Sequence, residues 1–295
     1  MSRRETVELS VIIPMHNEEE NVETLISELG RSLDALRVSA EIIAIDDAST
    51  DQTRQRLLEA IKTEPRLRIL GFSRQEGQTA AIRAGIDKAN GLLLVTLDGD
   101  GQNPPADIIS LVEELRRSGA DMVVGWRRDR QDKLFSRRFP SAVANRLIRL
   151  VTGTPIHDTG CTLKVMKSTL AKRLPLPDGM HRFIPVLARN YLRGNVVEIE
   201  VDHRPRTAGQ SKYGWGRVLP VLRDIAIVGR LSFPGWVITR LAEFLVLFSL
   251  FRFLLQLDPW LSALSAIAVG GVISILCWRR LTMVPATKIE FDSWN

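Results

Sequence analysis

Five short apolar runs, separated by segments whose apolar residues have helical spacing, constrain the fold of the first 126 residues. The runs are VELSVIIP (7–14), EIIAIDD (41–47), LRILGF (67–72), LLLVTLD (92–98) and DMVVGW (121–126). Helical patterns lie between them, the clearest at Val22, Leu25, Ile26, Leu29, Leu33 and Leu36. This alternation is typical of a parallel sheet covered by helices on both faces. The sequence therefore predicts an α/β fold.

The chain from 127 to 215 is less regular. A basic segment comes first, followed by a helix near 141–152, a loop TGTPIHDTGCTLK (152–164), a helix near 181–193 and a strand NVVEIEV (195–201). These elements extend the same domain and are expected to complete its sheet.

Acidic residues stand where two of the predicted strands end. Asp46 and Asp47 follow one apolar run, and Asp98 and Asp100 follow another, with Gln102 two residues further on. In parallel α/β sheets, ligands bind outside the carboxyl ends of the strands. Two carboxylates there can hold Mg²⁺ or Mn²⁺ together with substrate phosphates, although Asp-Gly-Asp alone is also a common solvated turn. No G-x-G-x-x-G follows the first strand and no P-loop motif occurs, which disfavours those nucleotide sites.

The net charge indicates which kinds of partner the protein binds, and the cysteines indicate the redox compartment in which it works. The chain has 40 Lys and Arg against 34 Asp and Glu, a net charge of +6, which suits an anionic partner. Zinc-finger spacing and RNA-binding aromatic motifs are absent, so nucleic acid is not expected. Two cysteines in dissimilar stretches predict no disulfide framework and fit a reducing compartment. The start MSRRETVELS lacks the apolar core of a signal peptide, so we expect the N-terminal domain in the cytosol.

The C-terminal part has a different character. WLSALSAIAVGGVISILCW (260–278) has no charged residue and is long enough to cross a bilayer, and 241–257 is nearly as apolar. We interpret them as a transmembrane hairpin with basic flanks on the cytosolic side; the alternative is a buried soluble helix pair. Before the hairpin, Arg217, Arg223 and Arg230 predict a basic stripe on a helix that lies on anionic headgroups, where an ordinary solvated face is the alternative.

Several motifs in order carry a specific resemblance. They are IIPMHNEEENV, IDDASTDQT, SRQEGQTAAIRAGI, LDGDGQNPP, DTGCTLKVM and RTAGQSKY, between about residues 8 and 215. Together they resemble the family 2 glycosyltransferases of GT-A fold, and within them the polyprenyl-phosphate sugar synthases, such as dolichol-phosphate mannose synthases and undecaprenyl-phosphate glycosyltransferases. The resemblance implies that residues 1–215 form a cytosolic GT-A domain. Together with the apolar and basic patterns of the C-terminal part, it gives a predicted organisation that continues with a juxtamembrane amphipathic segment (216–235), two transmembrane helices (236–281) and a cytosolic tail (282–295).

The resemblance also implies roles for individual residues. Those expected to contact the nucleotide sugar are Pro14, Glu18, Asp46, Asp47, Arg74, Gln78 and Asp98. The expected metal-binding signature is Asp98, Asp100 and Gln102, holding Mg²⁺ or Mn²⁺. The expected acceptor-phosphate segment contains Arg127, Arg138 and Ser141, while Asp158, Arg206 and Lys212 are expected at the reaction centre. His16 and Gln75 depart from the family's usual tyrosine and asparagine, which puts the nucleotide base in doubt.

The resulting hypothesis is an inverting enzyme that transfers a hexose-type sugar from a nucleotide diphosphate sugar to polyprenyl phosphate. It would be a multi-pass protein of the cytoplasmic membrane with its catalytic domain in the cytosol, and homo-oligomerisation is left open. One alternative is a membrane-tethered transferase acting on a sugar or lipid hydroxyl, with Asp158 as the base. Another is a non-enzymatic scaffold that keeps the nucleotide pocket, which the complete acidic set disfavours.

Overall fold

The computed structural model describes residues 7–128 and 139–205, together with 241, 244, 246–248 and 291–294; the side chains of 139–144 and 291–294 are not described. The strands are β1 (Leu9–Met15), β2 (Ala40–Asp46), β3 (Leu67–Phe72), β4 (Leu93–Thr96), β5 (Met122–Trp126), β6 (Lys164–Lys167), β7 (Val196–Glu200) and β8 (Phe291–Trp294). The helices are α1 (Val22–Leu36), α2 (Thr53–Ala60), α3 (Gln78–Lys88), α4 (Asp107–Ser118), α5 (Phe139–Thr152), α6 (Ser168–Ala171) and α7 (Ile184–Val186), with a 3-10 turn η2 (Met180–Phe183) and a π-turn η3 (Leu187–Tyr191) on either side of α7.

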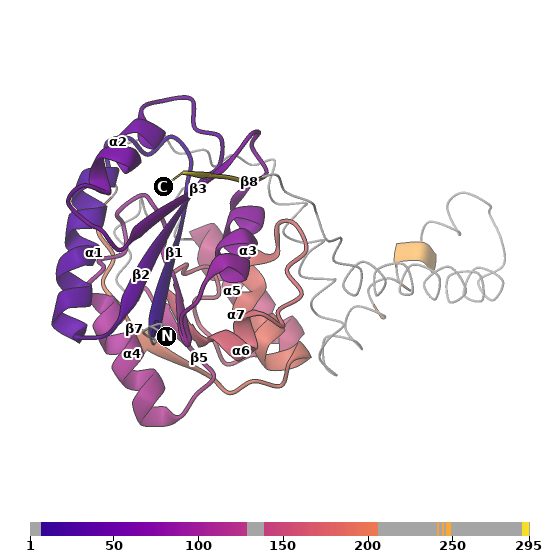
Figure 1. Cartoon of the computed structure of the whole chain (residues 1–295). Coiled ribbons are helices and arrows are strands. Elements are labelled where there is room, and N and C mark those ends of the chain that lie inside the picture. Colours follow the sequence, from indigo (N-terminus) through magenta and orange to yellow (C-terminus); the bar gives the residue numbers. More distant parts are fainter. Residues whose placement is uncertain are drawn as a thin grey trace.

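One sheet organises the domain, in the order β7-β5-β6-β4-β1-β2-β3-β8. β4, β1, β2 and β3 are parallel, as are β5 and β7, whereas β6 runs antiparallel to β4 and β5 (Figure 1). The predicted mostly parallel, GT-A-like α/β fold is thereby confirmed. All five strands predicted before residue 127 are present, and so is the strand predicted at 195–201.

Two hydrophobic clusters bury the sheet on both faces. Successive residues of β1 alternate between them: Ile12 packs with α3, α5 and α7, while Val11 and Ile13 pack with α1 and α4. This alternation follows from the period of two along a strand. Because both faces are covered, the central strands read as unbroken apolar runs, which is the pattern that identified them in the sequence.

Helix α3 lies unusually close to the sheet because of a glycine. A Cβ atom placed on Gly85 would come 2.3 Å from Cγ2 of Ile12 and 3.1 Å from Cδ1 of Ile45. Real side chains do not approach so closely, so only glycine lets α3 settle at this depth. The C-terminal half of α3 consequently packs directly onto β1 and β2.

Three regions differ from the sequence prediction. The stretch assigned to a loop at 152–164 ends at Lys164, where β6 begins, and this antiparallel strand was missed. The helix expected near 181–193 is a mixed 3-10, α and π segment from Met180 to Tyr191. At the far end of the chain, Phe291–Trp294 forms β8 against β3, whereas the sequence analysis predicted no strand in the tail.

Almost all of the predicted juxtamembrane segment and transmembrane hairpin lies outside the described residues. Leu241, Phe244 and residues 246–248 are helical. Within the described part of the chain, no helix is both long and apolar enough to cross a membrane. The hairpin at 236–281 stays a prediction.

A partly buried ion pair fastens the α2–β3 connection to α1. Arg66 donates from Nε and Nη2 to the two carboxylate oxygens of Glu64, each at 2.7 Å, and from Nη2 to the carbonyl oxygen of Gly30 at 3.2 Å. These hydrogen bonds from Arg66 hold the pKa of Glu64 below its usual value. A depressed carboxyl pKa stabilises the fold above the unfolded-state pKa, and the stabilisation is lost as the pH falls through the folded-state pKa.

We therefore expect Glu64→Gln to lower the stability at neutral pH by about 2 kcal/mol, since hydrogen bonds to charged groups contribute about that much. For a domain of this size, the loss corresponds to about 6 °C in Tm. The Tm difference between the two proteins should shrink as the pH falls below the ordinary pKa of a glutamate, and it should vanish once the pH has passed the lowered folded-state pKa of Glu64, because the native protein is then protonated there. Thermal unfolding across pH measures this. The matched control is Glu59→Gln on exposed α2, and an equal effect of both substitutions would contradict the prediction.

Candidate active site

The site lies where the order of the parallel strands reverses. β1 pairs with β2 on one side and with β4 on the other, and all three strands end at the same edge of the sheet. Such a switch point opens a crevice outside the strand ends. Asp46 ends β2, and Asp98 comes two residues after the end of β4. The structure thus brings together two acidic groups that lie more than fifty residues apart in the sequence.

Asp46 and Asp47 hold the loops that border this edge. Both are almost fully buried, at 3 % and 4 % exposure. Asp46 Oδ1 accepts a hydrogen bond from the Ser49 amide at 3.0 Å, while Asp47 accepts from the amides of Glu76 at 2.7 Å and Gly77 at 2.9 Å. Gly77 has φ of 91°, a conformation that favours glycine. Asp47 therefore fixes the residue from which α3 begins.

Pro14 and Glu18 lie at the end of β1 and in the loop that follows. Pro14 is buried beside Ile45 of β2. The Glu18 amide donates to Thr53 Oγ1 at 2.8 Å, and its carboxylate accepts from Asn21 Nδ2 at 2.7 Å. Glu18 thereby joins the β1–α1 loop to the start of α2, on the same border of the site as Asp46.

Asp98 is oriented by two side chains from different elements. Gln78 Nε2, on the first residue of α3, donates to Asp98 Oδ1 at 2.7 Å, and Thr162 Oγ1 donates to Asp98 Oδ2 at 2.7 Å. Gln78, which was expected among the nucleotide-sugar contacts, therefore lies beside Asp98. Arg74, by contrast, extends into solvent with its side chain 83 % exposed and pairs with Glu76 at 2.6 Å.

The donor set suits a hard divalent cation that is shared with a substrate. Asp98 and Asp100 provide two carboxylates on one loop, and Asp100 Oδ1 accepts from the Gln102 amide at 3.2 Å. Among the described residues no three His, Cys, Asp or Glu side chains gather to form a metal cage. Mg²⁺ commonly takes one or two carboxylates and completes its shell with substrate phosphates and water. Asp98 and Asp100 fit that kind of site.

Arg127 and Asp158 form a buried, bidentate ion pair. Arg127 Nε donates to Asp158 Oδ2 at 2.8 Å and Nη2 to Oδ1 at 3.2 Å, with the two side chains only 10 % and 4 % exposed. Burial alone lowers the pKa of Arg127, but negative groups around it, Asp158 and Asp98 among them, raise it above its ordinary value. The Asp158 amide is also held, donating to Glu198 Oε1 at 2.8 Å. The sequence analysis assigned Arg127 and Asp158 separate roles and did not predict their pairing.

A fully buried lysine lies behind the site, and the sequence analysis missed it. Lys164, the first residue of β6, donates from Nζ to the carbonyl oxygen of Cys161. Burial lowers the pKa of Lys164, an effect that the negative charges of Asp98 and Asp158 oppose. Thr96 Oγ1 donates to the Thr162 carbonyl at 2.6 Å, so the loop that orients Asp98 is fixed at both ends. The signal available was the Thr-x-Lys alternation in DTGCTLKVM, which is compatible with a strand.

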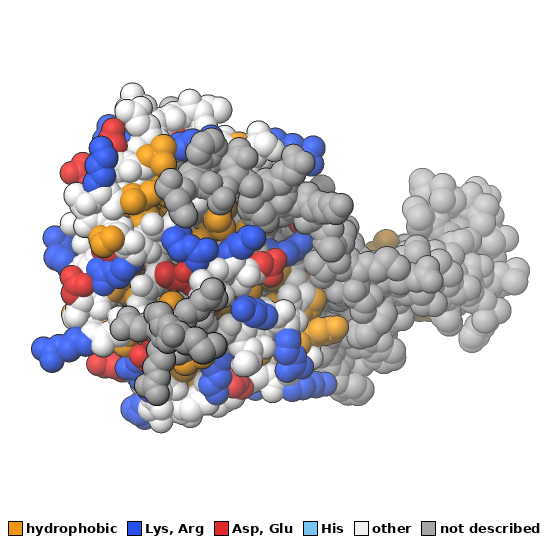
Figure 2. Space-filling view, viewed as in Figure 1, with side chains coloured by type: hydrophobic (Ala, Val, Ile, Leu, Met, Phe, Trp, Pro, Cys, Tyr) orange, Lys and Arg blue, Asp and Glu red, His pale blue; other side chains and the backbone are white. Residues whose placement is uncertain are grey.

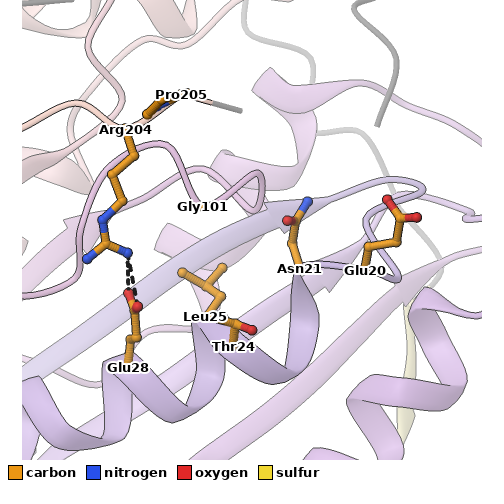
Figure 3. Close-up of a pocket in the computed structure, with 8 residues that line it drawn as sticks. All are labelled: Glu20, Asn21, Thr24, Leu25, Glu28, Gly101, Arg204 and Pro205. Carbon is orange, nitrogen blue, oxygen red and sulfur yellow. Dashed lines mark hydrogen bonds and ion pairs between the residues drawn. The ribbon is translucent and has the colours of Figure 1, made fainter. Parts of the chain in front are cut away.

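A pocket of about 340 Å³ adjoins the loop of Asp98, Asp100 and Gln102 on the α1 side (Figure 3). Its lining residues are Glu20, Asn21, Thr24, Leu25, Glu28, Gly101, Arg204 and Pro205. Arg204 reaches across it to Glu28, with Nη1 2.9 Å from both carboxylate oxygens, and the Arg204 amide donates to the Gln102 carbonyl at 2.8 Å. The segment that leads to Arg206 is therefore fastened to the loop that carries Asp98, Asp100 and Gln102.

Four of the predicted residues cannot be placed at the level of their side chains. Arg138, Arg206 and Lys212 lie outside the described residues. Ser141 belongs to α5, but its side chain is not described. Their predicted roles remain predictions.

Comparison with known proteins identifies the class. Residues 10–174 match the description "Glycosyl transferase family 2". The chain is 42 % identical over 229 residues to a dodecaprenyl-phosphate galacturonate synthase of Rhizobium johnstonii, covering 76 % of this chain and 67 % of that one. It is 35 % identical over 285 residues to an undecaprenyl-phosphate 4-deoxy-4-formamido-L-arabinose transferase of Edwardsiella ictaluri, covering 93 % and 86 %. The chain belongs to glycosyl transferase family 2 and is a glycosyltransferase, which confirms the resemblance found in the sequence.

Solved structures agree on the fold. Glucosyl-3-phosphoglycerate synthase from Mycobacterium tuberculosis, in complex with Mn²⁺ and UDP-glucose, aligns with a TM-score of 0.56 at 17 % identity, covering 76 % of this chain and 78 % of that one. A mannosyltransferase from Pyrobaculum calidifontis, in complex with GDP-mannose and Mn²⁺, aligns with a TM-score of 0.53 at 17 % identity, covering 91 % and 87 %. At this identity the likeness establishes the GT-A-like fold alone.

Proposed function

We propose that this enzyme transfers a sugar, with inversion, from a nucleotide diphosphate sugar to polyprenyl phosphate at the cytosolic face of the membrane. The observation that carries the proposal is the relationship to enzymes named for polyprenyl-phosphate sugar transfer, at up to 42 % identity. The oriented Asp98 at the switch point supports it, because a donor diphosphate needs a cation site there.

The proposed chemistry needs charge compensation more than a base. A phosphate monoester has its second pKa near 6, so the acceptor is largely a dianion at neutral pH and is already nucleophilic. Asp98 and Asp100 would hold Mg²⁺ or Mn²⁺, which when bound neutralises the donor diphosphate as it departs. Arg206 and Lys212 are proposed to screen the two anions as they meet. Attack from the face opposite the leaving group gives inversion.

A hydroxyl acceptor is the second candidate, and the geometry of Asp158 counts against it. A hydroxyl must lose a proton to a base, and Asp158 was the candidate in the sequence. Both of its oxygens accept hydrogen bonds from Arg127 in a buried pair. A carboxylate held in this way is a weak base and is committed to its partner. We therefore propose that Asp158 positions Arg127 and the 158–162 loop.

The test incubates the purified full chain with Mg²⁺ or Mn²⁺, undecaprenyl phosphate and a panel of UDP- and GDP-sugars. The panel includes the galacturonate and 4-deoxy-4-formamido-L-arabinose donors, since relatives carry these sugars in their names. We expect a glycolipid from at least one donor, no product with undecaprenol, and a rate that rises through pH about 6 with acceptor ionisation. Product formation on undecaprenol or on free sugars, with none on the phosphate, would reject the proposal.

A further inference from the structure

The charges of the domain are separated along the chain. Residues 7–128 carry 14 Lys and Arg against 21 Asp and Glu, whereas residues 145–195 carry nine against two. The second segment forms β6 within the sheet, together with most of α5 and with α6, α7 and η3, which cover the sheet on the side away from α1, α2 and α4 (Figure 1). One side of the domain is therefore strongly basic although the chain as a whole carries only +6.

Six of the nine basic side chains of this segment are exposed or half-buried on or next to α5, α6 and η3, and we call these six the basic face. Its members are Arg146, Arg149, Lys172, Arg173, Arg189 and Arg193. None of the six lies within ion-pair distance of a carboxylate among the described residues. In Figure 2, Lys and Arg side chains gather beside hydrophobic ones over the region where Figure 1 places α6 and α7.

Specific contacts hold the three parts of the basic face together. Asn190 Nδ2 of η3 donates to the carbonyl oxygen of Thr152, the last residue of α5, at 2.8 Å. Gly194 approaches Leu170 of α6 so closely that a Cβ atom would come 3.1 Å from its Cδ1. The ends of α5, α6 and η3 are thus adjacent, so their arginines and lysines form one patch.

Exposed apolar side chains interrupt the basic face. Leu150 of α5 is 65 % exposed and Tyr191 of η3 is 36 % exposed. On α5, Arg146, Arg149 and Leu150 occupy one helical stripe, while Ile148 and Val151 are buried on the other. Cationic side chains surrounding a leucine and a tyrosine are the composition of surfaces that lie in the headgroup region of a bilayer.

We propose that the basic face docks the catalytic domain directly onto anionic lipid headgroups, separately from any membrane-spanning segment. The docking would hold α5 near the headgroups, and α5 contacts a loop of the active site, since Thr159 Oγ1 donates to Asn145 Oδ1 at 3.1 Å. This purpose rests on the proposed lipid acceptor, whereas the docking itself is a property of the surface. Each Lys or Arg near an anionic leaflet strengthens association about fivefold.

The experiment uses the full chain in nanodiscs of phosphatidylcholine alone, or of equal parts phosphatidylcholine and phosphatidylglycerol, with a headgroup nitroxide lipid as quencher. A fluorophore is attached at Arg193→Cys in a Cys277→Ser background, Cys161 being buried. The control label is at Lys62→Cys, which is exposed after α2 on the opposite side of the sheet. We expect strong quenching at position 193 only with phosphatidylglycerol, and its loss in about 1 M salt, where the Debye length is about 3 Å.

The charge-reversal variant Arg146→Glu, Lys172→Glu, Arg173→Glu should reduce that quenching about tenfold or more. It should also leave transfer to a detergent-solubilised acceptor unchanged, since none of the three residues belongs to the active site. Equal quenching in the two lipids, an unaffected reversal variant, or equal quenching at position 62 would overturn the docking proposal. If the protein forms product but does not dock, the docking proposal fails and the proposed function stands. If it docks but forms no product, the proposed function fails and the docking proposal stands.

Discussion

Replacing Asp98 by Asn is expected to lower kcat by at least about a hundredfold, the scale seen when one preorganised electrostatic group is removed from a transition state. The substitution keeps the shape of the side chain, and its two hydrogen bonds can survive. The Asn oxygen can accept from Gln78, and the Thr162 hydroxyl, which donates to Asp98 at 2.7 Å, can rotate to accept from the new amide. What is lost is the negative charge, so the effect should report on cation binding.

The experiment therefore measures metal affinity as well as turnover. Mn²⁺ affinity in the presence of the nucleoside diphosphate, followed by electron paramagnetic resonance, should weaken in Asp98→Asn and in Asp100→Asn. The matched control is Asp107→Asn at the start of α4, whose carboxylate accepts from the Asp202 amide at 2.9 Å and which has no predicted role in the site. If Asp98→Asn kept both Mn²⁺ affinity and kcat within a few fold of the original protein, the assignment of this loop to a metal would be wrong.

The fold was predictable from the sequence because the parallel strands are buried on both faces. Burial on both sides forces continuous apolar runs, and the helices between them show one apolar stripe. β6 lacked that signal: its run Lys164–Lys167 begins and ends with lysine, and Lys164 is buried against expectation. A lysine is rarely buried without compensating negative groups, and here they come from Asp158 in the preceding loop and from Asp98, which is distant in the sequence.

The candidate site was predictable in part. As with β6, the part that could not be predicted depends on contacts between separate segments of the chain. Strand topology placed Asp46 and Asp98 at one edge, because the ends of parallel strands meet there. The partners of these residues depend on loops whose paths the sequence pattern does not fix. Arg127 lies 31 residues before Asp158, and no periodicity relates them. Only the antiparallel return of the chain through β6 brings the 158–162 loop beside β5 and its Arg127.

The pair formed by Arg127 and Asp158 leads to the second large effect. Arg127→Met should destabilise the protein by about 3–5 kcal/mol, because it leaves the Asp158 carboxylate buried without its partner. Asp158→Leu should destabilise the protein by a similar amount, because it leaves the Arg127 guanidinium buried without its carboxylate partner. The double variant should recover most of this loss, since replacing a whole buried ion pair by apolar residues is often close to neutral. Thermal or denaturant unfolding of the four proteins gives the coupling energy.

The same double-mutant cycle separates a structural role from the predicted contact with the acceptor phosphate. If Arg127 serves only to neutralise Asp158, the double variant should regain both stability and transfer activity. If Arg127 also binds the acceptor, the double variant should be stable but should show a raised KM for polyprenyl phosphate, with an unchanged KM for the donor. The 10 % exposure of the Arg127 side chain and the two hydrogen bonds it donates to Asp158 favour the first outcome. A coupling energy near zero would contradict both, because it would mean that the buried charges do not depend on each other.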